Sequence, residues 1–226
     1  MTDSEQEATD HLRTIRTLME RATVYRALSA PGALTGGLLA LLVCGLLALR
    51  ASSPRLSTLE FMGVWLLVLA VLTGFNFWLL RRGALRRGEA FVSSGMRMAL
   101  QAISPPMAAG FILSYLSACY RQQSYFEMAS YWMLFYGLGL LAMRSFAPKS
   151  LIALGGGFFT LGLTGFLPMV REWLNMQPYP LGILYMALSF GLLHLVYAAS
   201  VWMARSPEDL SSPSPSHAGD PSGGAA

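Results

Sequence analysis

His194 is the residue in this sequence with the clearest capacity for chemistry, because an imidazole can donate, accept or transfer a proton near neutral pH. It lies within a stretch without charged residues, and an ionisable group inside a lipid bilayer is a candidate for function. Tyr197 follows three residues later and therefore lies on the same face of a helix. With two further polar residues, these form a candidate intramembrane site of His194, Tyr197, Asn76 and Ser189.

The rest of the inventory argues against catalysis. The apolar stretches contain no carboxylate that could relay a proton, and the sequence has no HExxH, GxSxG, P-loop or Cys/His cluster. Cys44 and Cys119 are too few for a disulfide framework or a metal cluster. We therefore predict a non-enzymatic protein with no catalytic residue, no metal and no cofactor. His194 also has a second interpretation, a packing residue whose imidazole is satisfied by one polar neighbour. The candidate neighbours are Asn76, Ser114, Tyr115, Ser117, Ser130, Tyr131, Tyr136, Tyr185 and Ser189.

Long uncharged segments determine how these residues must be positioned. The chain has 226 residues, of which 54% are hydrophobic and 12% charged, and its mean hydropathy is +0.48. Between Arg26 and Arg205, charged residues fall only at the breaks between six apolar segments. A helix needs about 20 apolar residues to cross a bilayer. The pattern predicts an all-α membrane protein whose transmembrane domain, residues 31–204, is a compact bundle of six helices. The predicted spans are about 31–49, 61–80, 100–120, 125–143, 150–169 and 181–203.

The distribution of basic residues predicts the orientation of this bundle. Twelve of the 16 Lys and Arg residues lie in the two terminal segments and in the loops on the same side, and four lie in the opposite loops. Loops that are rich in Lys and Arg stay in the cytoplasm. We therefore expect a multi-pass membrane protein with both termini in the cytoplasm.

Residues 1–30 precede the first span, and the part from 10 to 26 has the pattern of a cytoplasmic amphipathic helix. Apolar residues recur there at spacings of three or four, at Leu12, Ile15, Met19, Ala22 and Tyr25. Such a helix can lie in the membrane interface or pack on the bundle. The alternative is that residues 10–26 bind a membrane or cytoplasmic protein partner. The segment opens with acidic and polar residues, so no cleavable signal peptide is expected.

A second basic segment follows the second span and contains Arg81, Arg82, Arg86 and Arg87. Each Arg near an anionic membrane surface contributes about 1 kcal/mol of attraction, so these four residues are candidate contacts for lipid headgroups. The run is short and adjoins the membrane, which argues against binding of nucleic acid. Residues 205–226 are rich in Ser, Pro and Gly, and we expect a disordered tail there.

Small residues mark the predicted contact faces of the helices, because helices in lipid associate through close backbone approach rather than water exclusion. The stripes are Gly36, Ala40, Cys44 and Ala48; Gly110, Ser114 and Ala118; Gly155, Gly156, Gly157, Thr160 and Thr164; and Ala187 with Gly191. The three consecutive glycines have an alternative interpretation, an unwound point that lines a cavity. Pro105 and Pro106 either open the third helix or kink it.

Four stretches in order along the chain resemble a family of uncharacterised bacterial six-span integral membrane proteins. They are LRTIRTLMERATVYRAL, MRMALQAISPPMAAGFILSYL, YWMLFYGLGLLA and FGLLHLVYAASVWMAR, and they extend over most of residues 12–204. The segment FGLLH around His194 is similar to a Gly-rich, His-containing last span in that family, whereas GGLLALL departs from its Trp-containing first span. The resemblance implies six helices in a bacterial cytoplasmic (inner) membrane. It implies no activity, so it assigns no functional residue.

Two functions of different classes follow as hypotheses. The first is a non-enzymatic accessory, sensory or assembly component that works by binding, as the uncharged spans and small-residue faces indicate. The second is a small transporter or channel for an apolar or neutral solute, with His194 lining its path. The lipid bilayer is the partner common to both, and the sequence specifies no oligomeric state.

Overall fold

The chain folds into helices wherever its structure is described. The computed structural model describes five stretches, at 30–50, 56–87, 94–121, 125–145 and 147–204, and they contain no strand. The predicted all-α class is therefore confirmed for these stretches. The predicted amphipathic helix at residues 10–26 and the predicted tail at 205–226 lie outside the described residues.

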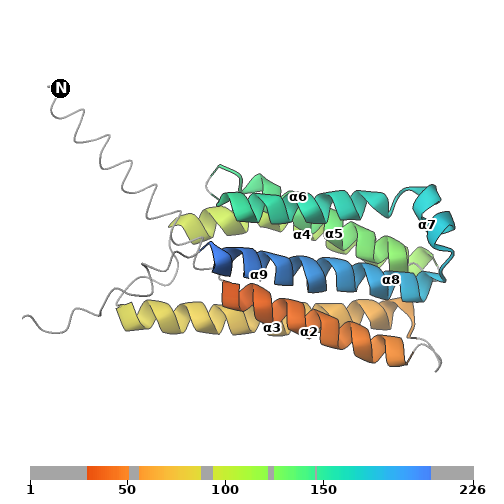
Figure 1. Ribbon diagram of the computed structural model, residues 1–226, viewed down its shortest axis with the longest axis horizontal. Coiled ribbons are helices and arrows are strands. Elements are labelled where there is room, and N and C mark those ends of the chain that lie inside the picture. The colour runs from red at the N-terminus through yellow and green to blue at the C-terminus, as the bar shows by residue number, and fades with distance from the viewer. Residues whose placement is uncertain (1–29, 51–55, 88–93, 122–124, 146, 205–226) are drawn as a thin grey trace, which may run out of the picture.

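The long helices pack side by side in one bundle, and the short helix α7 lies at one end of it (Figure 1). In chain order the elements are α2 (Ala30–Leu49), α3 (Thr58–Arg87), α4 (Ser94–Tyr120), α5 (Tyr125–Ala142), α6 (Lys149–Thr164), α7 (Pro168–Leu174), α8 (Pro178–Met186), η1 (Ala187–Leu193) and α9 (His194–Met203). The last three are continuous and form one rod, of which η1 is π-helical. This rod contacts α2 on one side and α6 on the other.

Four of these helical segments are long and apolar enough to cross a membrane. They are Pro31–Leu49, Thr58–Arg86, Met96–Tyr120 and Pro178–Met203, and a fifth span results if α6 and α7, which meet at a bend of 81°, count as one. α5 is not among them, and its sequence begins with Tyr125, carries Glu127 in its first turn and includes several further polar side chains. It packs against α4, α6 and α8, so much of its surface contacts protein. The apolar helices therefore support a membrane-embedded protein, and the count of six spans stays a prediction.

Glycines bring α5 and α6 into backbone contact. A Cβ atom added to Gly137 would lie 2.5 Å from the backbone nitrogen of Phe159, and one added to Gly162 would lie 2.6 Å from that of Leu134. Gly155 faces the side chain of Leu140 in the same interface. Because any larger residue would push the two backbones apart, these glycines set the spacing of the two helices.

α3 begins with a reciprocal capping interaction. The backbone N–H of Ser57 donates to Oε2 of Glu60 at 2.7 Å, and the N–H of Glu60 donates to Oγ of Ser57 at 3.2 Å. This capping box satisfies two N–H groups that have no acceptor in the first helical turn. Glu60 therefore has a local role in starting the helix.

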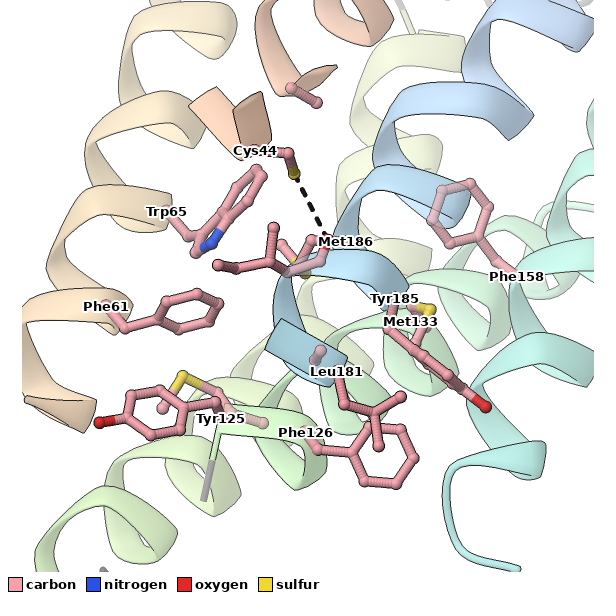
Figure 2. Close-up of a cluster of buried hydrophobic side chains, with 14 of the residues drawn as sticks. Cys44, Phe61, Trp65, Tyr125, Phe126, Met133, Phe158, Leu181, Tyr185 and Met186 are labelled. Carbon is pink, nitrogen blue, oxygen red and sulfur yellow. Dashed lines mark hydrogen bonds between the residues drawn. The ribbon is translucent and has the colours of Figure 1, made fainter. Parts of the chain in front are cut away.

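An aromatic cluster attaches the capped end of α3 to the rest of the bundle (Figure 2). Phe61 meets Tyr125 edge to face with ring centroids 5.5 Å apart, and it lies 6.2 Å from the ring of Tyr179. The hydroxyl of Tyr125 donates to the carbonyl of Leu56 at 2.6 Å. Beside this cluster, the thiol of Cys44 faces the carbonyl of Ile183 at 3.5 Å. The described structure thus gives Cys44 the packing role that its sequence context predicts.

Two helices extend beyond their predicted spans. α3 continues through Arg87, so the basic segment is helical up to that residue rather than a loop. α4 begins at Ser94 and contains Pro105 and Pro106 in its interior. Proline at 105 cannot donate to the carbonyl of Gln101, and the hydroxyl of Ser104 lies 3.5 Å from that carbonyl and partly replaces the missing N–H.

The last rod begins three residues before the predicted span at about 181–203. Its first residue is Pro178, and proline is favoured in the first helical turn because the N–H it lacks would have no acceptor there. Asn175, in the turn after α7, has a positive φ of 46°, a conformation that Asn adopts more readily than most residues. Asn175 therefore forms part of the turn that joins α7 to α8.

Candidate functional site

His194 lies among aromatic rings from three elements. Its imidazole is 5.3 Å from the ring of Phe158 on α6, 5.8 Å from Tyr136 on α5 and 6.0 Å from Phe190 on η1, measured between centroids. The hydroxyl of Tyr136 lies 3.3 Å from Nε2 of His194, which makes this hydroxyl its side-chain hydrogen-bond partner. The imidazole is thus satisfied at one nitrogen and enclosed by rings.

The second nitrogen of His194 is less well satisfied. Nδ1 is buried and has no hydrogen-bond partner of good geometry among the described residues. The backbone carbonyls of Ser189 and Phe190, in the preceding turn, are the acceptors that interact with the imidazole. That turn is π-helical, and a π-helical turn shifts the backbone hydrogen-bonding pattern and is frequent at functional sites. The π-helical turn therefore lies directly before the histidine whose buried Nδ1 lacks a well-placed partner.

The candidate residues around His194 are only partly brought together. Tyr197 is buried and close enough to Tyr136 for an electrostatic interaction. Ser189 is also buried, but its hydroxyl donates to the carbonyl of Tyr185 at 2.7 Å. Asn76 lies against Gly32 at the contact of α3 with α2, where a Cβ on Gly32 would be 2.6 Å from Oδ1 of Asn76. Asn76 therefore belongs to a helix contact and not to the surroundings of His194.

Aromatic residues make up most of the observed site, and they differ in how well they could be predicted from the sequence. Tyr136 was one of nine candidate partners, with nothing to favour it over the others. Phe190 lies four residues before His194 on the same rod, so helical spacing could have identified it. Phe158 comes from a different helix, and its place depends on how α6 packs against the rod.

A groove runs along the outside of α6 where this helix meets η1. Its volume is about 520 Å³. Gly156, Gly157, Thr160, Leu161, Thr164, Leu188, Leu192 and Leu193 line it. The hydroxyl of Thr164 bonds to the carbonyl of Leu161 at 2.7 Å and lies 3.1 Å from the hydroxyl of Tyr185. The groove is therefore apolar apart from the threonines at 160 and 164 on its α6 wall.

The three consecutive glycines of α6 serve different faces of one intact helix. Gly155 is buried against α5, whereas Gly156 and Gly157 line the groove. The helix continues without interruption from Lys149 to Thr164, so the unwound conformation considered from the sequence is wrong. The remaining part of that interpretation, a hollow beside the glycines, agrees with the groove.

The basic candidates lie at the end of α3. The side chains of Arg81, Arg82 and Arg86 are exposed, and the guanidinium carbon of Arg82 lies 5.3 Å from the centre of the Trp78 ring. The side chain of Arg87 lies outside the described part of the structure. These groups are far along α3 from Glu60, its single carboxylate.

The remaining side chains with capacity for chemistry are the cysteines and the possible metal ligands. Within the described stretches, no three His, Cys, Asp or Glu residues come together in a way that could hold a metal ion. Cys44 is buried in the bundle, and Cys119 is exposed near the end of α4. The hydroxyl of Tyr136 and Nε2 of His194 can share a hydrogen bond.

In comparisons with known proteins, no family model, no curated protein and no solved structure matches this chain. The resemblance to bacterial six-span membrane proteins therefore stays a prediction from the sequence. The function has to be argued from the geometry.

Proposed function

We propose that this chain is a non-enzymatic accessory or assembly component of a bacterial inner membrane. In this proposal it works by holding a transmembrane helix of a partner protein in the groove between α6 and η1. The observation that carries the proposal is the groove itself, which has small residues on one wall and leucines on the other.

The α6 wall of the groove has the pattern of a helix-packing surface. Gly156, Thr160 and Thr164 recur every four residues and therefore lie along one stripe. Small residues at this spacing let a second helix approach closely and add hydrogen bonds through threonine hydroxyls. A Cβ on Gly156 would meet no described atom within 4 Å, so no helix in the described part of the chain lies against the stripe at that point.

The proposal includes six membrane spans with both termini in the cytoplasm. Two of the six need a physical justification, because α5 is not among the helices that are long and apolar enough to cross a membrane, and α6 has only 16 residues. The contacts of α5 with α4, α6 and α8 support its place within the bilayer, since protein rather than lipid covers much of it. Residues 10–26 remain a second candidate contact for a partner.

Site-directed crosslinking in the native membrane tests the helix-docking role. A photoreactive amino acid at position 160 should give a discrete product with a second protein, and the same group at Leu42, exposed on α2, should not. Gly156→Leu should abolish the product because leucine fills the groove, while the protein stays folded. Gly74→Leu is the matched control, since a Cβ at Gly74 also meets nothing within 4 Å.

Two results would contradict this function. One is an unchanged product in Gly156→Leu, which would exclude the groove as the docking surface. The other is a product with twice the mass of this chain, which would indicate self-association instead of an accessory role.

A second candidate function is a path for a small neutral solute past His194. The buried Nδ1 and the adjoining π-helix favour it, because both offer polar groups inside an apolar bundle. Solute-dependent thermal stabilisation that is lost in His194→Ala would support this path. Equal stabilisation of that variant and the wild type would exclude His194 from this path. The docking function is the better supported of the two, because aromatic rings enclose His194.

A further inference from the structure

We propose that the exposed face of α3 binds an anionic phospholipid, with its acyl chains along an apolar track and its phosphate on a cluster of arginines. We call this surface the α3 lipid face. It consists of Leu67, Val71, Phe75, Trp78, Arg81, Arg82, Leu85 and Arg86. It shares no residue with the groove between α6 and η1.

The length of α3 places the arginines at the surface of the membrane. The helix has 30 residues, which corresponds to about 45 Å at 1.5 Å per residue, and the hydrocarbon core is about 30 Å thick. About ten residues of α3 must therefore lie outside the core. Because α3 stays helical through Arg87, the backbone holds Arg81, Arg82 and Arg86 in fixed positions on this projecting part.

Helical spacing aligns the arginines with the apolar track. Trp78, Arg82 and Arg86 are each four residues apart, and Arg81 and Leu85 lie three and seven residues after Trp78. All five side chains are exposed, whereas Ala84 between them is buried. The charged groups therefore point away from the protein and toward the surrounding lipid.

Two aromatic rings, of Phe75 and Trp78, lie between the apolar track and the arginines. Trp78 stacks on Phe75 with ring centroids 6.1 Å apart and an interplanar angle of 23°. The guanidinium of Arg82 lies over the ring of Trp78 at 5.3 Å. Tryptophan favours the boundary between headgroups and acyl chains, so the ring and the guanidinium together fix the depth at which a headgroup would sit.

Charge complementarity identifies the occupant. α3 carries its single carboxylate, Glu60, at its opposite end, and the neighbouring helices α2 and α4 contain none. The described parts of these three helices therefore offer the arginines no negative partner. A phosphodiester supplies a negative charge and several acceptor oxygens, which suit the donors of guanidinium. Above it, Val71 and Leu67, which are 54% and 66% exposed, offer an apolar surface to the acyl chains.

Lipid binding to the purified full-length protein tests this inference. Phosphatidylglycerol or phosphatidylcholine is added to the protein in a neutral detergent, and the bound lipid is counted by native mass spectrometry. We expect the wild type to bind phosphatidylglycerol about tenfold more tightly than phosphatidylcholine. The double variant Arg82→Gln with Arg86→Gln should lose this preference, and so should the wild type near 1 M salt, where charges are screened within about 3 Å.

A matched control removes two positive charges elsewhere. Arg50 and Arg121 are exposed at the far ends of α2 and α4, so Arg50→Gln with Arg121→Gln should keep the preference. Both double variants should unfold at the wild-type temperature in neutral detergent, because these side chains are exposed. Trp78→Leu should weaken binding by less than the arginine variant, since the arginines still contact the phosphate.

Three results would overturn the inference. The first is an unchanged preference in the variant of Arg82 and Arg86. The second is an equal loss in the control variant of Arg50 and Arg121, which would indicate a general effect of net charge. The third is complete displacement of the lipid by soluble glycerol phosphate at equal concentration, which would exclude a contribution from the acyl track.

Discussion

The contact between α5 and α6 and the contact of α3 with the bundle use opposite kinds of residue. Glycines at 137, 155 and 162 bring α5 and α6 together at backbone distance. α3 is longer than either helix, yet its candidate span is only 6% buried and it meets α2 and α4 at few points. Large apolar side chains cover α3, whereas the interface of α5 and α6 depends on the absence of side chains.

This difference reflects the solvent that the two regions face. In water, large apolar side chains promote packing because burial removes them from the solvent. In a bilayer, lipid tails solvate leucine and phenylalanine well, so these residues give little drive to association. Close contact then requires shape, and glycine provides it. The interface of α5 and α6 has the fewest apolar side-chain atoms. We therefore expect these two helices to be the hardest to separate.

The strongest test of this contrast is Gly137→Leu. A Cβ at this position would lie 2.5 Å from the backbone nitrogen of Phe159 and 2.8 Å from the carbonyl oxygen of Gly155, and backbone atoms cannot move aside as a side chain does. We expect a loss of more than about 3 kcal/mol of stability, or no recoverable folded protein. Thermal unfolding in a neutral detergent measures it.

Gly63→Leu is the matched control for this variant, because α3 has open space there and a Cβ would meet no described atom within 4 Å. We expect its unfolding temperature to equal that of the wild type. If the two leucine variants unfolded at the same temperature, close approach of α5 and α6 would not be the source of stability.

Phe61→Ala should loosen α3 from the bundle and leave the interface of α5 and α6 unchanged. Phe61 is fully buried and links α3 to Tyr125 and Tyr179 through edge-to-face contacts. Its removal leaves a cavity and should cost about 3 kcal/mol. Hydrogen exchange should increase in α3 and remain slow in α5 and α6. A uniform increase over all helices would show that α3 and the glycine interface unfold as one unit.

The sequence predicted the helices better than the contacts between them. Charge-free segments identify apolar helices because an unpaired charge is costly in a bilayer, and this rule does not depend on neighbours. Contact faces do depend on neighbours. The predicted stripe of α4 is confirmed at Gly110 and Ser114, which are buried. On α2, Ala40 and Cys44 are buried but Ala48 is exposed, and Gly37 rather than Gly36 approaches the carbonyl of Gly191.

The candidate site shows the same limit. A single histidine in an apolar segment is visible in any sequence, and its position predicted that it needs a polar partner. Which of nine candidates would supply the partner depended on how α5 packs beside the rod that contains His194, and periodicity within one helix carries no such information. Asn76 lies away from His194 for this reason, because at Asn76 α3 faces Gly32 of α2.

Tyr136→Phe tests the polar contact inside the glycine-packed region. The variant keeps the ring that packs against Phe158 at 4.8 Å and removes the hydroxyl that faces Nε2 of His194. We expect a loss of about 1 kcal/mol. In a double-mutant cycle with His194→Leu, the two losses should not add, because either variant alone breaks the same hydrogen bond. Full additivity in thermal unfolding would show that this hydrogen bond contributes nothing.

Leu67→Ala should have the smallest effect and is the most direct test of lipid as a solvent. Leu67 is 66% exposed on α3, so lipid or detergent replaces the lost methyl groups and the stability should change by less than about 0.5 kcal/mol. Leu140→Ala removes the same groups from a fully buried position on α5 and should cost at least about 2 kcal/mol. Equal losses in thermal unfolding would mean that a protein surface covers Leu67. That outcome would show that α3, like α5 and α6, is packed against protein and does not face lipid.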